Sequence, residues 1–325
     1  MKCSVVILNW NGAKTLQQFL PSVLQHTQLS DVEIVVADNG STDESLDYLR
    51  TQPVRVIALD QNYGFAEGYN RAIAQVDSDY VVLLNSDVEV TPHWLDTLLE
   101  FARTHEDVVA LQPKVLSWHS KQDVLAGKAQ KVRFEHAGAA GGMIDCLGYP
   151  YCYGRFLSHV EEDNGQYDTP APIFWASGAC LFIKRDVYVD EGGLDGVFFA
   201  HQEEIDLCWR LHCRGYQIMS VPQSVVYHVG GGTLGYESPR KTFLNFRNNL
   251  LMLYKNLPPT KWLLVMLIRW PLDYVAAMQM LLAGKWLNFN AVLQARCAFW
   301  RLRKQYKMIR KGNLRNSKVL NPTII

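Results

Sequence analysis

The chain has 325 residues, of which 48% are hydrophobic and 20% are charged. A chain of this size buries a large core without disulfides or a structural metal, and its composition excludes a wholly disordered or collagen-like protein. Its seven cysteines include no Cys-x-x-Cys pair. The sequence therefore argues against a disulfide framework or a structural zinc site and is typical of a reducing compartment.

The net charge of zero conceals a strong asymmetry between the two ends of the chain. Residues 240–325 contain 16 lysines and arginines but a single acid, Asp273, whereas residues 1–239 contain 31 acids. A basic end of this kind predicts an anionic partner, either a phospholipid membrane or a nucleic acid.

The first 90 residues alternate short apolar runs with helical patterns. The runs are typical of strands covered on both faces, as in a parallel sheet. The first run is followed by Asn-Trp-Asn-Gly instead of a cleavage site, so we interpret it as a strand and expect a cytoplasmic protein. This order predicts a doubly wound α/β sheet with its ligand at the carboxyl ends of the strands. We expect strands at 5–8, 34–37, 54–59 and 80–84, and helices at 13–26, 43–52 and 66–75.

Polar residues follow each of these four strands, which predicts a binding crevice along one sheet edge. Asp38 could accept a hydrogen bond from a nucleobase or a ribose, or could cap the helix after it. The chain has no G-x-G-x-x-G after its first strand and no P-loop. These absences exclude a dinucleotide-binding dehydrogenase and a P-loop NTPase.

Two segments could contribute metal ligands. Asp87 follows the fourth strand, and carboxylate oxygens at a sheet edge suit Mg²⁺ or Mn²⁺, although a solvated turn has the same pattern. His228 ends an apolar run just before Gly230, Gly231 and Gly232. A metal or phosphate could approach there, although a lone histidine is more often structural.

Three acids, Glu203, Glu204 and Asp206, begin a helix that we expect at 203–214. Their charges could simply stabilise the helix N-terminus through its dipole. A carboxylate in this half-buried setting could instead have a raised pKa and act as a general base.

The basic end of the chain predicts an amphipathic helix at 296–311. Phe299, Leu302, Tyr306 and Ile309 recur at helical spacing among basic residues. We expect this helix on an anionic membrane surface, although it could pack against the protein's own acidic body. The interleaved Trp and Leu residues favour lipid over nucleic acid. Arg269 and Asp273 interrupt the apolar stretch before it, so we expect no membrane-spanning helix.

Taken together, these segments resemble family 2 glycosyltransferases, the inverting GT-A class, and particularly its rhamnosyltransferase-like branch. The resemblance covers residues 1–235. It rests on VVILNWNG at 5–12, VADNGSTD at 36–43, NYGFAEGYN at 62–70, LLNSD at 83–87, WASGA at 175–179 and the acids of 203–210.

The resemblance implies roles for individual residues. It assigns the metal, Mg²⁺ or Mn²⁺, to Asp87 and His228, and an acceptor-site aromatic to Trp175. It makes Glu204 the base, with Glu203 and Asp206 as rivals, although the family's usual base is Asp. Asn85 stands in place of the first acid of the D-x-D motif, which makes metal dependence less certain. The nucleotide-sugar contacts are assigned to Asn9, Asn11, Asp38, Asn62, Gly64, Gly68, Asn70, Asn85 and Ser86.

The resemblance also implies a function and a domain layout. It implies transfer with inversion from a dTDP- or UDP-sugar, with dTDP-rhamnose the first guess, to a lipid-linked glycan in cell-surface polysaccharide synthesis. The enzyme would be peripheral on the inner face of the cell membrane. Residues 1–110 would form a nucleotide-sugar half, 111–235 an acceptor half, and 236–325 a basic helical extension. The alternatives are a sugar nucleotidyltransferase and a catalytically degenerate nucleotide-binding scaffold.

Overall fold

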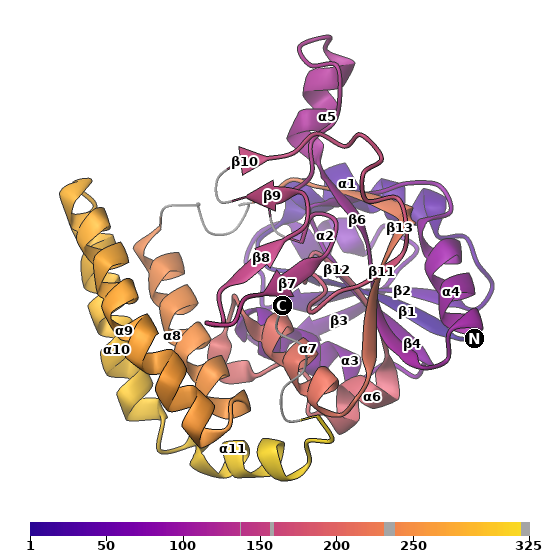
Figure 1. The fold of residues 1–325 in the computed structure, drawn as a ribbon. Coiled ribbons are helices and arrows are strands. Elements are labelled where there is room, and N and C mark those ends of the chain that lie inside the picture. The colour runs from indigo at the N-terminus through magenta and orange to yellow at the C-terminus, as the bar shows by residue number, and fades with distance from the viewer. Residues whose placement is uncertain (137, 157–158, 231–237, 320–325) are drawn as a thin grey trace.

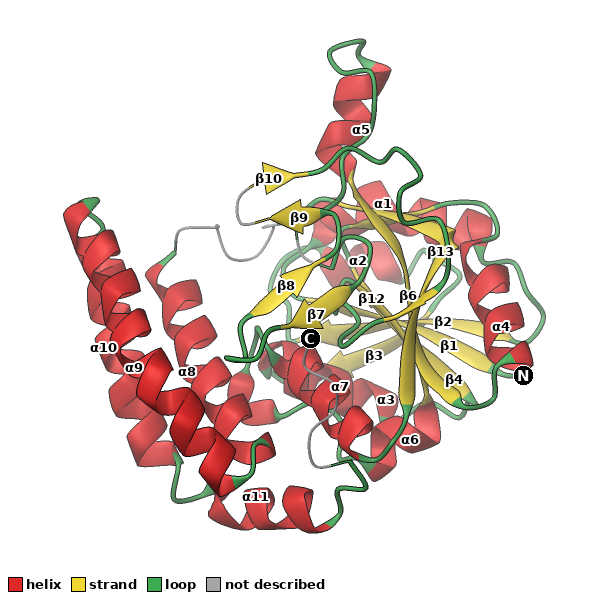
Figure 2. Ribbon diagram, viewed as in Figure 1, coloured by secondary structure: helices red, strands yellow, loops and turns green. Residues whose placement is uncertain are grey.

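The computed structural model describes residues 1–136, 138–156, 159–230 and 238–319. Its centre is a mixed sheet with the strand order β11-β13-β6-β12-β4-β1-β2-β3, and β5 pairs with β13 (Figures 1 and 2). The four neighbours from β4 to β3 are parallel, as the sequence predicts, and β12 runs antiparallel to β4. The strands are β1 (Cys3–Asn9), β2 (Val32–Asn39), β3 (Arg55–Leu59), β4 (Tyr80–Asn85), β5 (Val88–Val90), β6 (Val108–Ser117), β11 (Ala171–Pro172), β12 (Cys180–Lys184) and β13 (Gln217–His228).

Helices cover both faces of this sheet. Successive side chains of a strand point to opposite faces, so Val6 lies in one hydrophobic core while Val5 and Ile7 lie in the other. The core that contains Val6 is covered by α3 (Gly64–Ile73), α6 (Arg185–Asp190) and α7 (Glu203–Cys213). The other core is covered by α1 (Ala13–His26), α2 (Ser45–Leu49) and α4 (Trp94–Thr104). This arrangement confirms the predicted doubly wound α/β fold.

A small antiparallel sheet lies beside the central one. Gly142 in this sheet forms a bridge with Trp175, just before β12, which attaches the small sheet to the main sheet. A short helix, α5 (Trp118–Leu125), projects from the body above it (Figure 1). The strands are β7 (Gly142–Ile144), β8 (Pro150–Cys152), β9 (Arg155–Phe156) and β10 (His159–Val160).

Four helices follow the sheet: α8 (Pro239–Asn256), α9 (Pro259–Leu282), α10 (Trp286–Leu302) and α11 (Tyr306–Arg315). α8 contributes Leu250 to the same core as α3 and α7. α9 and α10 pack together on the side of α8 away from the sheet (Figure 1). The predicted boundary at 235 falls within 231–237, outside the described residues, so the division into domains stays a prediction.

The predicted amphipathic helix at 296–311 is wrong. The segment is divided between α10 and α11, and two of its four apolar positions point inward. Phe299 and Tyr306 are 1% and 2% exposed, and Phe299 packs edge-on against Tyr254 of α8. An amphipathic pattern shows that one face is covered without showing what covers it. Here the protein's own helices cover much of that face.

Candidate active site

The carboxyl ends of the parallel strands bring the predicted nucleotide-binding residues to one edge. In the sheet register, Asn9 at the end of β1 is opposite Asp38 of β2, and Leu8 is opposite Asn85 of β4. β12 runs in the reverse direction, so the segment before it reaches the same edge, where the backbone N–H of Asn85 donates to the Ala179 carbonyl at 3.0 Å.

Asp38 is almost fully buried at this edge, with 1% of its surface exposed. One carboxylate oxygen accepts from the Asn9 side-chain amide at 2.9 Å, and the other accepts from the backbone N–H of Ser41 at 2.9 Å. The side-chain oxygen of Asn9 is buried without a hydrogen-bond partner. A buried acceptor of this kind is costly unless a donor reaches it.

Asparagines also shape the neighbouring loops. Asn11 has a φ of 50° and accepts from the Thr42 N–H at 2.7 Å, which fixes the β1 loop against the β2 loop. Asn39, which sequence reasoning missed, accepts from the Tyr63 N–H at 3.0 Å. Its amide donates to the Asn62 side-chain oxygen at 3.2 Å. Asn39 therefore fixes the position of the loop that carries Asn62.

Three further residues of this predicted group have packing roles. A Cβ at Gly64 would lie 2.5 Å from the Phe199 ring, and a Cβ at Gly68 would lie 2.9 Å from Leu8. The Asn70 side chain donates to the Leu194 carbonyl and accepts from its N–H, at 2.7 and 2.9 Å. These contacts let α3 approach the sheet and the 194–199 loop closely, and direct contact with a nucleotide stays a prediction for all three.

The predicted metal ligands lie side by side. β5 pairs with β13 so that Val88 is opposite His228, and the His228 Nε2 atom lies 3.2 Å from a carboxylate oxygen of Asp87. Burial alone would lower the pKa of His228, but the Asp87 carboxylate raises it to about 10. Asn85 is adjacent, with its amide nitrogen 3.4 Å from the same Nε2. Ser86 is half-buried in the same loop.

These side chains fit a divalent ion that is coordinated partly by the protein and partly by the phosphates of the donor substrate. Within the four described ranges, no group of three or more His, Cys, Asp or Glu side chains is placed to hold a metal by itself. Mg²⁺ is commonly bound by only one or two carboxylates together with substrate phosphates. Asp87 and His228 would supply one oxygen and one nitrogen, and donor phosphates and water would complete the coordination.

The predicted catalytic acids follow a loop with an unusual backbone. Phe199, His201 and Gln202 have φ values of 65°, 71° and 73°, a conformation that costs about 1–3 kcal/mol for residues other than glycine. Both Glu203 and Glu204 have one carboxylate oxygen that is buried without a hydrogen-bond partner. Burial raises the pKa of Glu204 to about 7. Burial and the Glu204 charge hold the pKa of Glu203 well above its usual range.

Asp206 differs from these two glutamates. It is fully buried and pairs with Lys255 at 2.8 Å and with Arg210 at 3.1 Å. Burial would raise the pKa of Asp206, but the Lys255 and Arg210 cations hold it below its usual value. A carboxylate engaged by two cations is a weak base, so the geometry favours Glu204 over Asp206 for proton abstraction.

Glu135 lies beside the predicted metal ligand His228, and both Glu135 and Glu204 act electrostatically on Cys152 of β8. Burial raises the pKa of the Cys152 thiol to about 11, and the carboxylates of Glu135 and Glu204 add to that increase. A carboxylate oxygen of Glu135 lies 3.7 Å from the His228 Nδ1 atom. Sequence reasoning missed Glu135, because the segment FEHAG shows no pattern that marks it.

Trp175, the predicted acceptor-site aromatic, is only 5% exposed. Its indole N–H donates to the Met143 carbonyl at 2.8 Å, and its ring lies directly against Gly142. A sugar that stacks on an aromatic ring needs an open ring face. This geometry gives that role no support, and it stays a prediction.

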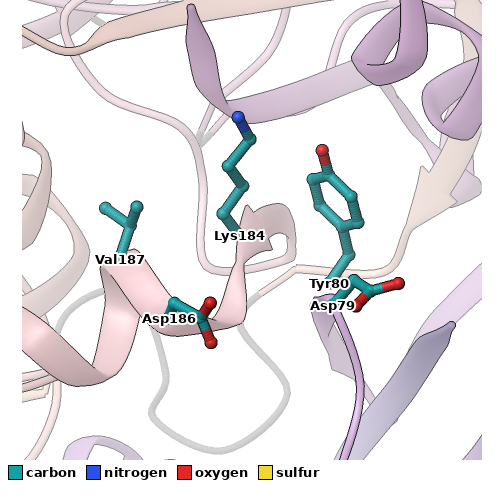
Figure 3. Close-up of a pocket in the computed structure, with 5 residues that line it drawn as sticks. All are labelled: Asp79, Tyr80, Lys184, Asp186 and Val187. Carbon is teal, nitrogen blue, oxygen red and sulfur yellow. The ribbon is translucent and has the colours of Figure 1, made fainter. Parts of the chain in front are cut away.

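A separate hollow of about 240 Å³ lies at the opposite edge of the central sheet (Figure 3). Tyr80 begins β4 and is paired with Lys184, which ends the antiparallel strand β12. The hollow is therefore at the amino ends of the parallel strands, away from the candidate site. It is lined by Asp79, Tyr80, Lys184, Asp186 and Val187.

Solved structures share this architecture. GalNAc-T7 with UDP, GalNAc and Mn²⁺ has a TM-score of 0.61 at 17% identity, covering 86% of this chain and 50% of that chain. S. aureus TarS residues 1–349 with UDP-GlcNAc has a TM-score of 0.55 at 16% identity, covering 97% and 89%. Likeness at these identities shows the fold alone, and it confirms the predicted GT-A fold.

Sequence comparisons identify the family. An N-acetylglucosaminyl-diphospho-decaprenol L-rhamnosyltransferase from Mycobacterium tuberculosis is 28% identical over 237 residues, covering 69% of this chain and 75% of the relative. The O-antigen biosynthesis protein RfbC from Myxococcus xanthus is 25% identical over 70% of this chain, which spans 17% of that protein. The glycosyl transferase family 2 model matches residues 4–188, more than half of the chain. The chain therefore belongs to glycosyl transferase family 2, and it is a rhamnosyltransferase-like glycosyltransferase.

Proposed function

We propose that this protein transfers a sugar from a nucleotide-sugar to a hydroxyl of a lipid-linked glycan, with inversion at the anomeric carbon. The observation that carries the proposal is one sheet edge with a buried Asn9–Asp38 pair and the Asp87–His228 pair, beside which the 199–202 loop packs on Gly64 and leads to the half-buried Glu204. These groups suit a nucleoside, a diphosphate and an attacking hydroxyl, respectively.

Glu204 is the proposed general base. The raised pKa of Glu204 is close to neutral pH, so its carboxylate is partly ionised there and accepts a proton readily. Deprotonated Glu204 would take the proton of the acceptor hydroxyl while that oxygen attacks the anomeric carbon from the face opposite the diphosphate. One base and one displacement suffice, so no covalent sugar–enzyme intermediate is required.

Asp87 and His228 are the proposed ligands of the divalent ion, Mg²⁺ or Mn²⁺. When bound there, the ion would neutralise the charge that develops on the leaving diphosphate. The Mn²⁺ in the GalNAc-T7 structure supports the use of a divalent metal by this fold.

The donor and the acceptor are proposed from the relatives. The mycobacterial relative is named for rhamnosyl transfer to a lipid diphosphate sugar, and RfbC for O-antigen synthesis. We therefore propose that the donor is a dTDP- or UDP-sugar, with dTDP-rhamnose as the first candidate. The acceptor would be a polysaccharide precursor anchored in the membrane. Access to such a precursor would place the enzyme peripherally on the cytoplasmic face of the membrane.

The proposal is tested by thermal unfolding with UDP, dTDP, GDP and CMP, with and without Mn²⁺, on the native protein and on Asp87→Ala. We expect one nucleotide to raise the Tm in the presence of Mn²⁺ and Asp87→Ala to abolish that increase. If none of the nucleotides stabilises the native protein, the transferase proposal fails and a degenerate scaffold becomes the better account. Asp186→Ala is a suitable control, since the Asp186 side chain is 86% exposed and lies at the opposite edge of the central sheet.

A further inference from the structure

We infer that the outer face of α9 lies in the headgroup region of an anionic membrane, with the helix axis parallel to the bilayer surface. This inference rests on the proposed function, because it specifies which surface brings the enzyme to its membrane-anchored acceptor.

The outer face of α9 is apolar apart from the exposed Gln279. Leu264, Leu267, Val275 and Leu282 are 62%, 65%, 54% and 84% exposed, and further exposed aliphatic side chains lie between them at helical spacing. The face continues into the start of α10, where Trp286 is 59% exposed. Isolated exposed apolar residues are normal on soluble proteins, but a contiguous face of this length marks an interaction site.

No charge interrupts the part of this face that α9 forms. The only charged residues of α9 after Lys261 are Arg269 and Asp273, which are 2% and 1% exposed on the inner side. They pair with each other at 3.3 Å, and Arg296 of α10 pairs with Asp273 at 3.1 Å. The charged side chains that would penalise insertion thus lie paired inside the protein and not on the outer face of α9.

α9 is also the single helix of the described residues that is long and apolar enough to cross a membrane. Its inner side argues against crossing. Arg269 donates to the Leu147 carbonyl at 3.1 Å, and the Tyr149 hydroxyl bonds Asp273 at 3.2 Å. These contacts bond the middle of α9 to the turn between β7 and β8, so crossing would draw the catalytic body into the bilayer. Lying flat buries the apolar face and leaves these bonds intact.

The net positive charge of the C-terminal helices favours an anionic lipid over a second copy of the chain. The only acid after residue 239 is the buried Asp273. The cations Arg301, Lys304, Lys307 and Lys311 are exposed at the α10–α11 junction. Two such basic surfaces would repel each other, whereas each cation near an anionic bilayer adds to binding.

The test measures partitioning onto vesicles of phosphatidylcholine with phosphatidylglycerol, and onto pure phosphatidylcholine, at physiological salt. We expect the native protein to prefer the anionic vesicles. The double variant Leu267→Glu/Val275→Glu should lower its partitioning by about tenfold or more. The matched control is Leu125→Glu, because Leu125 is 71% exposed but lies on α5, remote from this face. Unchanged binding of the double variant, or an equal loss in the control, would overturn the inference.

Two additional measurements separate the remaining outcomes. Sedimentation velocity without lipid tests for a second copy: a dimer that the double variant dissociates, with vesicle binding unaltered, would assign the face to self-association and overturn the inference. Thermal stabilisation by the donor nucleotide is recorded for every variant. Loss of vesicle binding with nucleotide stabilisation retained supports the inference. If no nucleotide stabilises even the native protein, the proposed function fails while the vesicle result still decides the role of α9.

Discussion

Replacing Asn248 with alanine should destabilise the protein and slow sugar transfer, because this side chain joins α8 to the loop that presents Glu204. The amide nitrogen of Asn248 is fully engaged with consecutive parts of that loop. Its acceptors are the carbonyl oxygens of Phe198, Ala200 and His201, at 3.0, 3.0 and 2.7 Å.

The size of the effect follows from these contacts. Asn248 is fully buried, so in the variant the Ala200 and His201 carbonyls would lose a buried donor. With about 0.5–1.5 kcal/mol for each net hydrogen bond, and about 1–3 kcal/mol for a buried group left unpaired, the free energy of unfolding should fall by about 2–4 kcal/mol. The left-handed Phe199, His201 and Gln202 would then be free to relax, and Glu204 would move. A shift of about 1 Å at a reacting group can cost about a hundredfold in rate.

The assay combines urea unfolding with steady-state kinetics and nucleotide binding. We expect kcat to fall while the Kd of the donor nucleotide stays unchanged, since the Asn248 amide nitrogen bonds the 198–201 loop and not the Asp38 pocket. Asn245→Ala is the matched control: it lies on the same helix, and its one contact with the loop, from Gln202, is 3.5 Å long. Native stability and native kcat in Asn248→Ala would refute the idea that this amide holds the loop.

Three other substitutions test separate parts of the site. Glu204→Gln should lower kcat by a factor of about 10²–10⁴ with donor binding retained. In the native enzyme, kcat/KM should fall tenfold per pH unit below about pH 7, where Glu204 becomes protonated. A flat pH profile of kcat/KM from pH 5 to 8 would exclude Glu204 as the base. Because the pKa of Glu204 in the folded protein lies above the ordinary value of a glutamate, protonation of Glu204 stabilises the folded state, and that contribution is lost as pH rises through about 7. Gly64→Ala should destabilise the protein by about 1–3 kcal/mol in urea unfolding, because Gly64 has a φ of +79° and faces the Phe199 ring; a stability within error of native would contradict this packing. Lys255→Met should lower the free energy of unfolding by about 3–5 kcal/mol, since it removes one of the two cations that pair with buried Asp206. A smaller decrease than in an exposed control such as Lys318→Met would count against that role.

Local sequence patterns predicted the elements of the parallel sheet well. The helix at 13–26 has the predicted bounds, and the four strands lie where their apolar runs do. Alternation and helical periodicity report burial by neighbouring layers, and each parallel strand of this fold is covered on both faces. The same logic failed at 296–311, since the periodicity of Phe299 and Tyr306 could not distinguish a lipid surface from α8.

Contacts between distant segments were not predictable from local patterns. Asp87 and His228 are brought together by the pairing of β5 with β13, and before the structure only the family resemblance linked them. Asn248 and Glu135 have no recognisable motif, because their roles depend on where a loop and a histidine lie in space. The positive φ angles of the residues before Glu203 could not be predicted from the sequence either, since Phe, His and Gln rarely adopt that backbone conformation.

The same contacts connect the proposed base to the proposed membrane face. Asn249, next to Asn248 on α8, donates to the Gly148 carbonyl at 2.9 Å. Gly148 belongs to the turn that Arg269 of α9 also bonds, through Leu147. α8 therefore holds the loop before Glu203 through Asn248, while Asn249 bonds both Gln202 of that loop, at 3.2 Å, and the turn against which α9 is packed. A bilayer that fixes the outer face of α9 would thereby fix the orientation of Glu204 toward it, as an acceptor anchored in that bilayer requires. Exchanging Asn249 for alanine should loosen this connection, lowering kcat with a membrane-bound acceptor more than with a soluble acceptor analogue. Equal losses on both acceptors would show that the loop and the membrane face act independently.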